Sequence, residues 1–170
     1  MIFITVGTTQ FPMQRMVDVA AEIIRLRKDH ERIVFQYGNS SCLLHAPNLL
    51  TSREFPFQQV QRYMKEARLI ICHGGPATIY QALFWQKTPF VLPRERRFGE
   101  HVNDHQVAFV SLLSQKRLVV RVAPPTDIRS FLSSKPAKRK KKPSSAKAGI
   151  IVFLHNFLMA STPPTKWPSV

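Results

Sequence analysis

The stretch RLIICHGGPATIYQALFWQK, residues 68–87, decides the fold class of this chain. Its first part carries an unbroken apolar run, which is typical of a strand buried on both faces of a sheet. Two glycines then form a turn, and Pro76 follows at a position where a helix start tolerates its missing N–H. The remaining residues, 76–87, predict a helix. A buried strand that turns directly into a helix indicates an α/β protein.

The alternation of strand and helix continues on both sides of this stretch. Apolar runs predict the strands, and apolar residues at helical spacing predict the helices. The expected strands cover residues 2–6, 32–38, 48–55, 68–75, 88–93 and 117–122, and the expected helices cover residues 13–28, 56–67, 76–87, 103–115 and 125–134. We therefore expect an α/β domain over residues 1–132, with a parallel sheet and helices on both faces.

The composition changes after Ser134. Residues 133–170 contain eight Lys or Arg and no acidic residue, about half of the net charge of +15. The low-complexity segment KPAKRKKKPSSAKAG (135–149) predicts a disordered basic tail. The apolar segment IIVFLHNFLMA (150–160) is too short to span a membrane, and we find no run of ~18 apolar residues elsewhere.

The charge indicates an anionic partner, either a phosphate-bearing ligand, an acidic lipid surface or a nucleic acid. The tail could hold the chain at an anionic membrane, remain a solvated extension, or act through KRKKK as a nuclear-import or nucleic-acid patch. The body has no recognisable nucleic-acid-binding motif, so we do not expect nucleic acid as the partner. The N-terminus does not resemble a signal peptide, and two cysteines without metal-ligand spacing fit a reducing, cytoplasmic compartment. We expect Cys72 to be a small core residue.

The Gly74–Gly75 turn is the first candidate binding site. In open α/β sheets, ligands bind at the carboxyl ends of strands, where loops lead into helix N-termini. Glycines allow close backbone approach, the helix dipole favours negative charge, and Thr78 adds a hydroxyl donor. The turn is suited to a phosphate or diphosphate, or else is simply a tight strand-to-helix connection. It matches neither a Walker loop nor G-x-G-x-x-G.

Two further loops should reach the same edge of the sheet. VGTTQFP (6–12) offers donors at Gly7, Thr8 and Thr9. PRERRFGEHVNDHQVAF (93–109) contains polar and charged side chains, namely Arg94, Arg96, Arg97, Glu100, His101, Asp104, His105 and Gln106. The arginines belong either to a solvated loop or to an anion site. The two histidines are four residues apart, but neither an HExxH pattern nor a third ligand supports a metal, so we expect none.

Three motifs in order, IFITVGTTQFP (2–12), HGGPATIYQAL (73–83) and PFVLPRERRFGEHVNDHQ (89–106), resemble the C-terminal half of glycosyltransferase family 28. The similarity runs over residues 1–132. It is greatest to small stand-alone subunits of split transferases, both a bacterial exopolysaccharide type and the soluble subunit of the eukaryotic enzyme that adds the second GlcNAc to dolichyl-diphosphate-GlcNAc. GEHVNDHQ favours the bacterial type. The resemblance implies a Rossmann-like domain that forms one half of a GT-B fold.

The resemblance also implies a function. The chain would be the UDP-sugar-binding subunit of a two-component inverting glycosyltransferase that extends a lipid-linked saccharide, with GlcNAc or glucuronate as the transferred sugar. It would need no metal or other cofactor, and a membrane-anchored partner subunit would recruit it to the cytoplasmic face of a membrane. Carried over residue by residue, the donor-binding residues are Gly7, Thr8, His73, Gly74, Gly75, Ala77, Thr78, Gln81, Asp104, His105 and Gln106.

The catalytic base stays unassigned, with His73 and His101 as candidates if this chain supplies one. Two residues depart from the family pattern: Ala77 stands where the family has Gly, and Gln81 where it has Glu. An amide accepts ribose hydroxyls less well than a carboxylate, which corresponds to about 1–3 kcal/mol of donor binding. The alternative function is therefore a non-catalytic scaffold or regulatory subunit with a degraded donor site.

Overall fold

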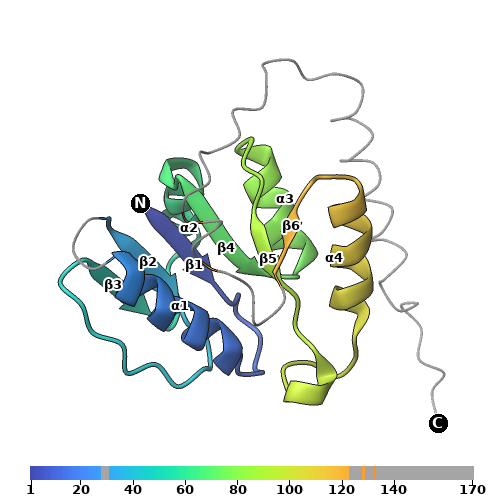
Figure 1. The fold of residues 1–170 in the computed structure, drawn as a ribbon, viewed down its shortest axis with the longest axis horizontal. Helices are drawn as coiled ribbons and strands as arrows, with labels where there is room; N and C mark the ends of the chain where they lie inside the picture. Colours follow the sequence, from blue (N-terminus) through green and yellow to red (C-terminus); the bar gives the residue numbers. More distant parts are fainter. Residues whose placement is uncertain (28–30, 123–127, 129–131, 133–170) are drawn as a thin grey trace, which may run out of the picture. The chain divides into compact units, whose positions relative to one another are not determined.

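The computed structural model of the chain describes residues 1–27, 31–122, 128 and 132. Its strands are β1 (Ile2–Thr5), β2 (Ile33–Gln36), β3 (Leu49–Ser52), β4 (Leu69–His73), β5 (Phe90–Leu92) and β6 (Val120–Arg121). Its helices are α1 (Gln14–Arg27), α2 (Phe57–Glu66), α3 (Pro76–Phe84) and α4 (His105–Gln115), with a 3-10 turn η1 (Arg96–Phe98). Strand and helix alternate along the chain (Figure 1), apart from β2 and β3, which follow each other without a helix between them, and this is the order that the sequence predicts.

Within the described residues, the strands form one parallel sheet in the order β3-β2-β1-β4-β5-β6. β1 lies between β2 and β4, and its Ile2 is in register with Ile33 on one side and Leu69 on the other. From β1 the chain first builds β2 and β3 on one side and then crosses to build β4, β5 and β6 on the other. This arrangement confirms the predicted α/β class and creates a switch point between β1 and β4.

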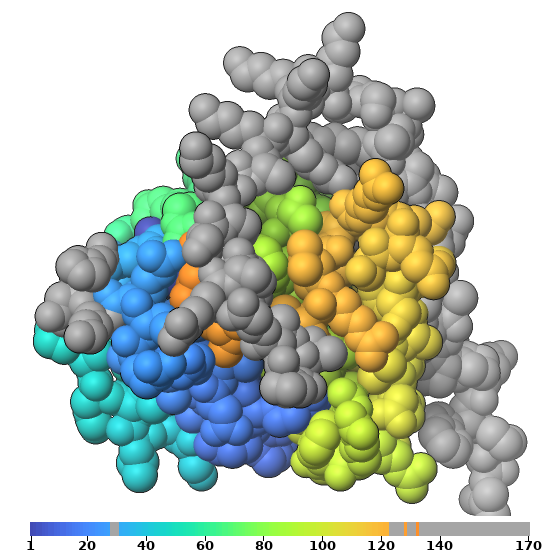
Figure 2. All heavy atoms as spheres, in the orientation of Figure 1, coloured from blue at the N-terminus to red at the C-terminus, as the bar shows by residue number. Residues whose placement is uncertain are grey.

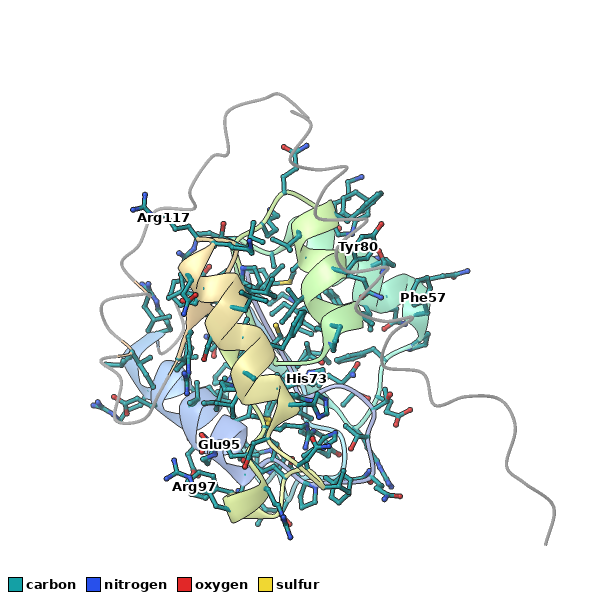
Figure 3. The ribbon with its side chains drawn as sticks, turned by 90° about the vertical axis from the view of Figure 1, so that its right-hand side faces the viewer. Phe57, His73, Tyr80, Glu95, Arg97 and Arg117 are labelled. Carbon is teal, nitrogen blue, oxygen red and sulfur yellow. The ribbon has the colours of Figure 1, made fainter. Side chains whose placement is uncertain are left out.

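Helices cover both faces of this sheet, as expected. α1 contributes Met16 and Ile23 to a buried cluster that also contains Ile4 and Phe35. On the opposite face, Phe3 of β1 packs against Tyr63 of α2 with ring centroids 5.6 Å apart. Right-handed crossovers place α2, α3 and α4 together on that face, because β3–β4, β4–β5 and β5–β6 all progress in the same direction. Figure 3 shows the sheet between α1 and the layer that contains α2 and α3.

The unbroken apolar runs belong to strands that are buried on both faces. Every residue of β1, β2 and β4 is buried. Cys72 on β4 is completely buried, and burial raises the pKa of its thiol to about 12, so it is the small core residue that we expected. The sequence signal was strong here because these strands are central ones.

The structure differs from the sequence expectations mainly at the ends of elements. α3 ends at Phe84 rather than at residue 87, because Gln86 has a positive φ of 59° and the N–H of Lys87 turns back to the carbonyl of Ala82 at 3.0 Å. In the described part of the chain, no helix is long and apolar enough to span a membrane. The predicted helix over 125–134, apart from residues 128 and 132, and the tail over 133–170 lie outside the described residues. The boundary at residue 132 therefore stays a prediction.

Candidate functional site

The carboxyl ends of β1 and β4 lie side by side at the middle of the sheet. Thr5 of β1 is in register with Cys72 of β4, and both strands run toward the lower part of Figure 1. β1 continues into the loop that leads to α1, whereas β4 turns directly into α3 on the opposite face. The two connections diverge at this point, which is where open α/β sheets bind their ligands.

His73 ends β4 and lies at the centre of this switch point. Only 6 % of it is exposed, and its Nδ1 atom has no hydrogen-bond partner among the described residues. The ring fills the space beside two glycines: a Cβ on Gly75 would lie 2.3 Å from Nε2, and a Cβ on Gly7 would lie 2.6 Å from Cε1. Figure 3 shows His73 inside the molecule, near the first turns of α3 and α4. Packing of the imidazole therefore requires glycine at both positions.

The surroundings of His73 keep its ring neutral. Burial lowers the pKa of His73 to about 3, and the nearby positive charge of Arg94 acts in the same direction. Burial, together with the neighbouring His105 and Arg94, also lowers the pKa of His101. A ring whose protonated form is this unfavourable is a weak base at neutral pH. His73, one of the two histidines that the sequence offered as catalytic bases, is therefore poorly suited to that role.

The N-terminus of α3 opens at the same edge. Gly75 is the N-cap, and no described side chain caps the helix there. Pro76 takes the first position, Ile79 donates its N–H to the carbonyl of Gly75 at 3.1 Å, and the amides of Ala77 and Thr78 have no partner within the helix. Ala77 is exposed and Thr78 is half-buried. Free amides and the positive end of the helix dipole make this terminus suitable for an anion.

Gln81 and Gln106 occupy different kinds of position. Gln81 is half-buried and lies three residues after Thr78, on the same side of α3. Gln106 is only 4 % exposed, and its Oε1 accepts the backbone N–H of Arg94 at 3.2 Å. A Cβ on Gly74 would lie 2.9 Å from that Oε1, so Gly74 is required by the packing of α4. The amide oxygen of Gln106 thus holds the loop after β5, and the contact of Gln106 with the donor stays a prediction.

Arg94 has a structural position that the sequence analysis did not anticipate. It is completely buried, so it belongs neither to a solvated loop nor to a direct anion contact. Its guanidinium donates to four backbone carbonyls, those of Val6 at 2.8 Å, Phe11 at 2.9 Å, Glu100 at 3.0 Å and Pro12 at 3.2 Å. Burial lowers the pKa of Arg94 to about 10 while Glu100 opposes the shift, so the side chain keeps its charge at neutral pH.

Arg15 on α1 supports the same loop and was missed by sequence reasoning. Its Nε donates to Oε1 of the buried Glu100 at 2.9 Å, Nη1 contacts Glu95 at 3.2 Å, and Nη2 donates to the carbonyl of Pro93 at 2.9 Å. Its guanidinium also lies 4.2 Å from the centre of the Phe98 ring. Figure 2 shows the loop between β5 and α4 lying against α1. The loop over 93–104 is thereby fixed to the rest of the domain.

The remaining predicted residues form the outer rim of the site. Asp104 is exposed, and its Oδ1 accepts the backbone N–H of Arg96 at 2.7 Å. His105 is also exposed, its Nδ1 contacts Oδ1 of Asn103, and its ring lies 4.6 Å from that of His101. The described residues contain no group of three or more His, Cys, Asp or Glu that could hold a metal ion. Two residues of the expected set, Thr8 and Gly7, lie on the loop after β1, with Thr8 exposed.

Of two similar solved structures, the first shows that this chain shares its fold. The chain aligns over 94 % of its length with the glycotransferase of kitacinnamycin, at a TM-score of 0.59 and 18 % identity, and covers 39 % of that protein. It also aligns over 90 % of its length with the glycosyltransferase SnogD from Streptomyces nogalater, at a TM-score of 0.47 and 16 % identity, and covers 43 % of it. The chain therefore spans about two fifths of the length of these glycosyltransferases.

Sequence comparison assigns the family. No curated protein matches the sequence. The profile of the glycosyltransferase family 28 C-terminal domain matches residues 1–155, which extends past the domain boundary that we expected at residue 132. The fold is the Rossmann-like half of a GT-B protein, as the resemblance implied. This chain belongs to the glycosyltransferase family 28 C-terminal domain family.

Proposed function

We propose that the chain is the donor-binding part of a glycosyltransferase and that it binds the diphosphate of a UDP-sugar at the N-terminus of α3. One observation carries the proposal. The uncapped start of α3 opens at the switch point of the sheet, directly beside the buried His73, whose Nδ1 lacks a partner among the described residues. An anionic group at this place would accept hydrogen bonds from the free amides and would lie at the positive end of the helix dipole.

The chemistry of the site supports a diphosphate leaving group. In an inverting transfer, an acceptor hydroxyl attacks the anomeric carbon, the bond from that carbon to the UDP oxygen breaks, and a base takes the hydroxyl proton. Negative charge then grows on the diphosphate. The amides of Ala77 and Thr78 and the Thr78 hydroxyl stabilise it there. The buried charge of Arg94 adds positive potential without touching the ligand, because its guanidinium is engaged by four carbonyls.

A second chain completes the enzyme in this proposal. The chain spans 39 % of the solved glycosyltransferase with the 0.59 TM-score, and its described residues form one sheet, which corresponds to one half of a GT-B fold. His73 is a weak base, which favours a base supplied from elsewhere. We infer that a membrane-anchored partner subunit brings both the base and a lipid-linked saccharide acceptor, and that this partner recruits the chain to the membrane. The transferred sugar is GlcNAc or glucuronate.

The alternative is a scaffold whose donor site has degraded. It rests on Ala77 and Gln81, which replace the Gly and Glu of the family pattern. Ala77 is exposed in the first turn of α3, at the helix end where the diphosphate would bind. Restoring the pattern with Ala77→Gly and Gln81→Glu separates the two functions. A large gain in UDP-sugar affinity would favour degradation, and unchanged affinity would favour an adapted site.

Calorimetric titration of UDP into the full chain tests the proposal. We expect saturable binding that is weaker for UMP, which lacks the second phosphate. Thr78→Val removes one hydroxyl donor at nearly constant volume and should weaken UDP binding about tenfold. Thr88→Val, at the amino end of β5 on the opposite edge of the sheet, is the matched control and should bind as the wild type does.

The outcomes separate the site from its alternatives. Equal affinity for UDP and UMP, or unchanged binding by Thr78→Val, would place the ligand away from the α3 N-terminus. No binding by the wild type but restored binding after Ala77→Gly and Gln81→Glu would support the scaffold function. No binding by either would mean that this chain does not bind a UDP-sugar by itself.

A further inference from the structure

Helices α2 and α3 pack against each other and carry an aromatic surface on their outer side. Trp85, directly after α3, donates its Nε1–H to Oε1 of Gln61 on α2 at 3.1 Å. The ammonium of Lys65 lies 5.5 Å from the centre of the Trp85 ring, and the Phe84 ring meets that of Trp85 edge-on at 5.2 Å. We define the α2–α3 aromatic face by six residues, namely Phe57, Gln61, Lys65, Tyr80, Phe84 and Trp85.

Two of these rings are largely exposed to solvent. Phe57 is 68 % exposed and Phe84 is 59 % exposed. Phe57 lies one turn before Gln61 on α2, and Tyr80 lies one turn before Phe84 on α3 with ring centroids 6.4 Å apart. Figure 3 shows Phe57 and Tyr80 on the side of the molecule that α2 and α3 occupy. The inward side of both helices is already filled by buried residues, among them Tyr63, Met64, Ile79 and Leu83.

The charge of this face is positive. Residues 57–65 and 76–87 contain no acidic side chain, and they contain Arg62, Lys65 and Lys87. The first carboxylate on α2 is that of its last residue, Glu66, which pairs with Nε of Arg62 at 3.3 Å. Across α2 and residues 76–87 three cations outnumber the single carboxylate of Glu66, and exposed aromatic rings with a net positive charge complement a surface that is both apolar and negatively charged.

We propose that the α2–α3 aromatic face docks on an anionic phospholipid surface. Trp and Tyr rings are favoured at the headgroup level of a bilayer, and exposed Phe side chains enter the boundary of the acyl chains. Lysines lay their aliphatic stems along apolar surface and place their ammonium groups among the lipid phosphates. The charge complementarity distinguishes this partner from an uncharged apolar surface, which would gain nothing from Lys65 and Lys87.

Docking through the α2–α3 aromatic face would also affect the candidate donor site, because α3 belongs to both. α3 begins at the switch point of the sheet and carries Tyr80 and Phe84 along its length. Docking through this helix would hold its N-terminus close to the bilayer surface, where a lipid-linked acceptor would be found. The docking itself does not rest on the proposed function, because vesicle binding is measured without UDP.

Vesicle binding by the full chain tests the proposal. The chain has two tryptophans, so Trp167→Phe leaves Trp85 as the only tryptophan reporter. With vesicles of phosphatidylcholine and phosphatidylglycerol, we expect lipids with brominated acyl chains to quench Trp85 fluorescence. Vesicles of phosphatidylcholine alone should cause much less quenching. In sedimentation, the double variant Phe57→Ser/Phe84→Ser should bind anionic vesicles about tenfold more weakly than the wild type.

The control removes two exposed leucines elsewhere. Leu43→Ser/Leu112→Ser alters side chains that are 88 % and 38 % exposed and lie outside the face, and it should bind as the wild type does. Circular dichroism checks that both double variants stay folded. If the chain sedimented with vesicles but the fluorescence of Trp85 was not quenched, the proposal would be overturned, because the basic tail would then account for binding. Unchanged binding by Phe57→Ser/Phe84→Ser would overturn it too. The proposal would also fail if the wild type did not bind vesicles but self-associated, and if Phe57→Ser/Phe84→Ser abolished that self-association. The face would then be a contact surface for a second copy of this chain.

Discussion

The buried, neutral His73 should make the domain sensitive to mild acid. Burial and the charge of Arg94 lower the pKa of His73 to about 3 in the folded chain, against 6.5 for an unperturbed histidine. Between these two values the unfolded chain binds a proton that the folded chain does not bind. The stability gained by keeping the ring neutral is therefore fully present above about pH 6.5 and is lost progressively as the pH falls toward 3.

The size of the effect follows from the two pKa values. Acidification from about pH 7 to about pH 5 protonates most of the unfolded-state imidazole and almost none of the folded-state one. The free energy of unfolding should fall by about 2 kcal/mol over this interval through His73 alone. His101, whose pKa is also lowered, adds a smaller effect of the same sign, because it is only partly buried. Carboxylates such as Glu31, whose pKa lies below 4.5 in the folded chain, contribute mainly at lower pH.

Urea unfolding at the two pH values measures this effect. His73→Gln removes the titrating group and should reduce the loss of stability on acidification by about 2 kcal/mol relative to the wild type. His45→Gln replaces an exposed histidine on the segment between β2 and β3 and serves as the control for removing an imidazole. If His73→Gln and the wild type lost equal stability between the two pH values, the ring would not be held neutral in the fold, and the reasoning would be refuted.

Three further predictions concern the site and its supports. Ala77→Asp should abolish UDP binding in calorimetry, because a carboxylate at the second position of α3 competes with the anion, whereas Gln58→Asp at the equivalent position of α2 should leave binding intact. Gly75→Ala should lower the free energy of unfolding by about 1–3 kcal/mol, since its Cβ would lie 2.3 Å from Nε2 of His73. A cost that did not shrink in a His73→Ala background would contradict this cause. Arg94→Met should cost about 3 kcal/mol or more in thermal unfolding, because four carbonyls lose their donor. A cost below about 1 kcal/mol would show that this contact is not structural.

The parts of the fold that could be predicted from the sequence have local signals. Central strands such as β4 are buried on both faces, so their apolar runs are unbroken, and Pro76 marks the start of α3. The Gly74–Gly75 turn was predicted either as a phosphate-binding turn or as a tight strand-to-helix connection, and its binding role stays a prediction. The structure adds a second reason for these glycines, because the imidazole of His73 and the amide of Gln106 occupy the space that a Cβ would need.

The supports of the site could not be predicted, because they join residues far apart in the sequence. Arg15 and Glu100 are separated by 85 positions, and Arg94 reaches the carbonyl of Val6 across 88 positions. In the sequence, Arg94 belongs to a run of arginines, and such runs usually lie in solvent. Only its position directly after a buried strand distinguishes it from Arg96 and Arg97, which are exposed.

The central claim is that the N-terminus of α3 holds the diphosphate of the donor. The most direct test is a titration of UDP into the isotope-labelled full chain, followed by the NMR shifts of individual backbone amides. The account predicts saturable shifts that are largest at Gly75, Ala77 and Thr78 and that are smaller with uridine, which has no phosphate. The account would be contradicted by shifts centred instead on residues 42–48, which lie between β2 and β3 and away from α3 in the sequence, or by shifts that were equal for UDP and uridine.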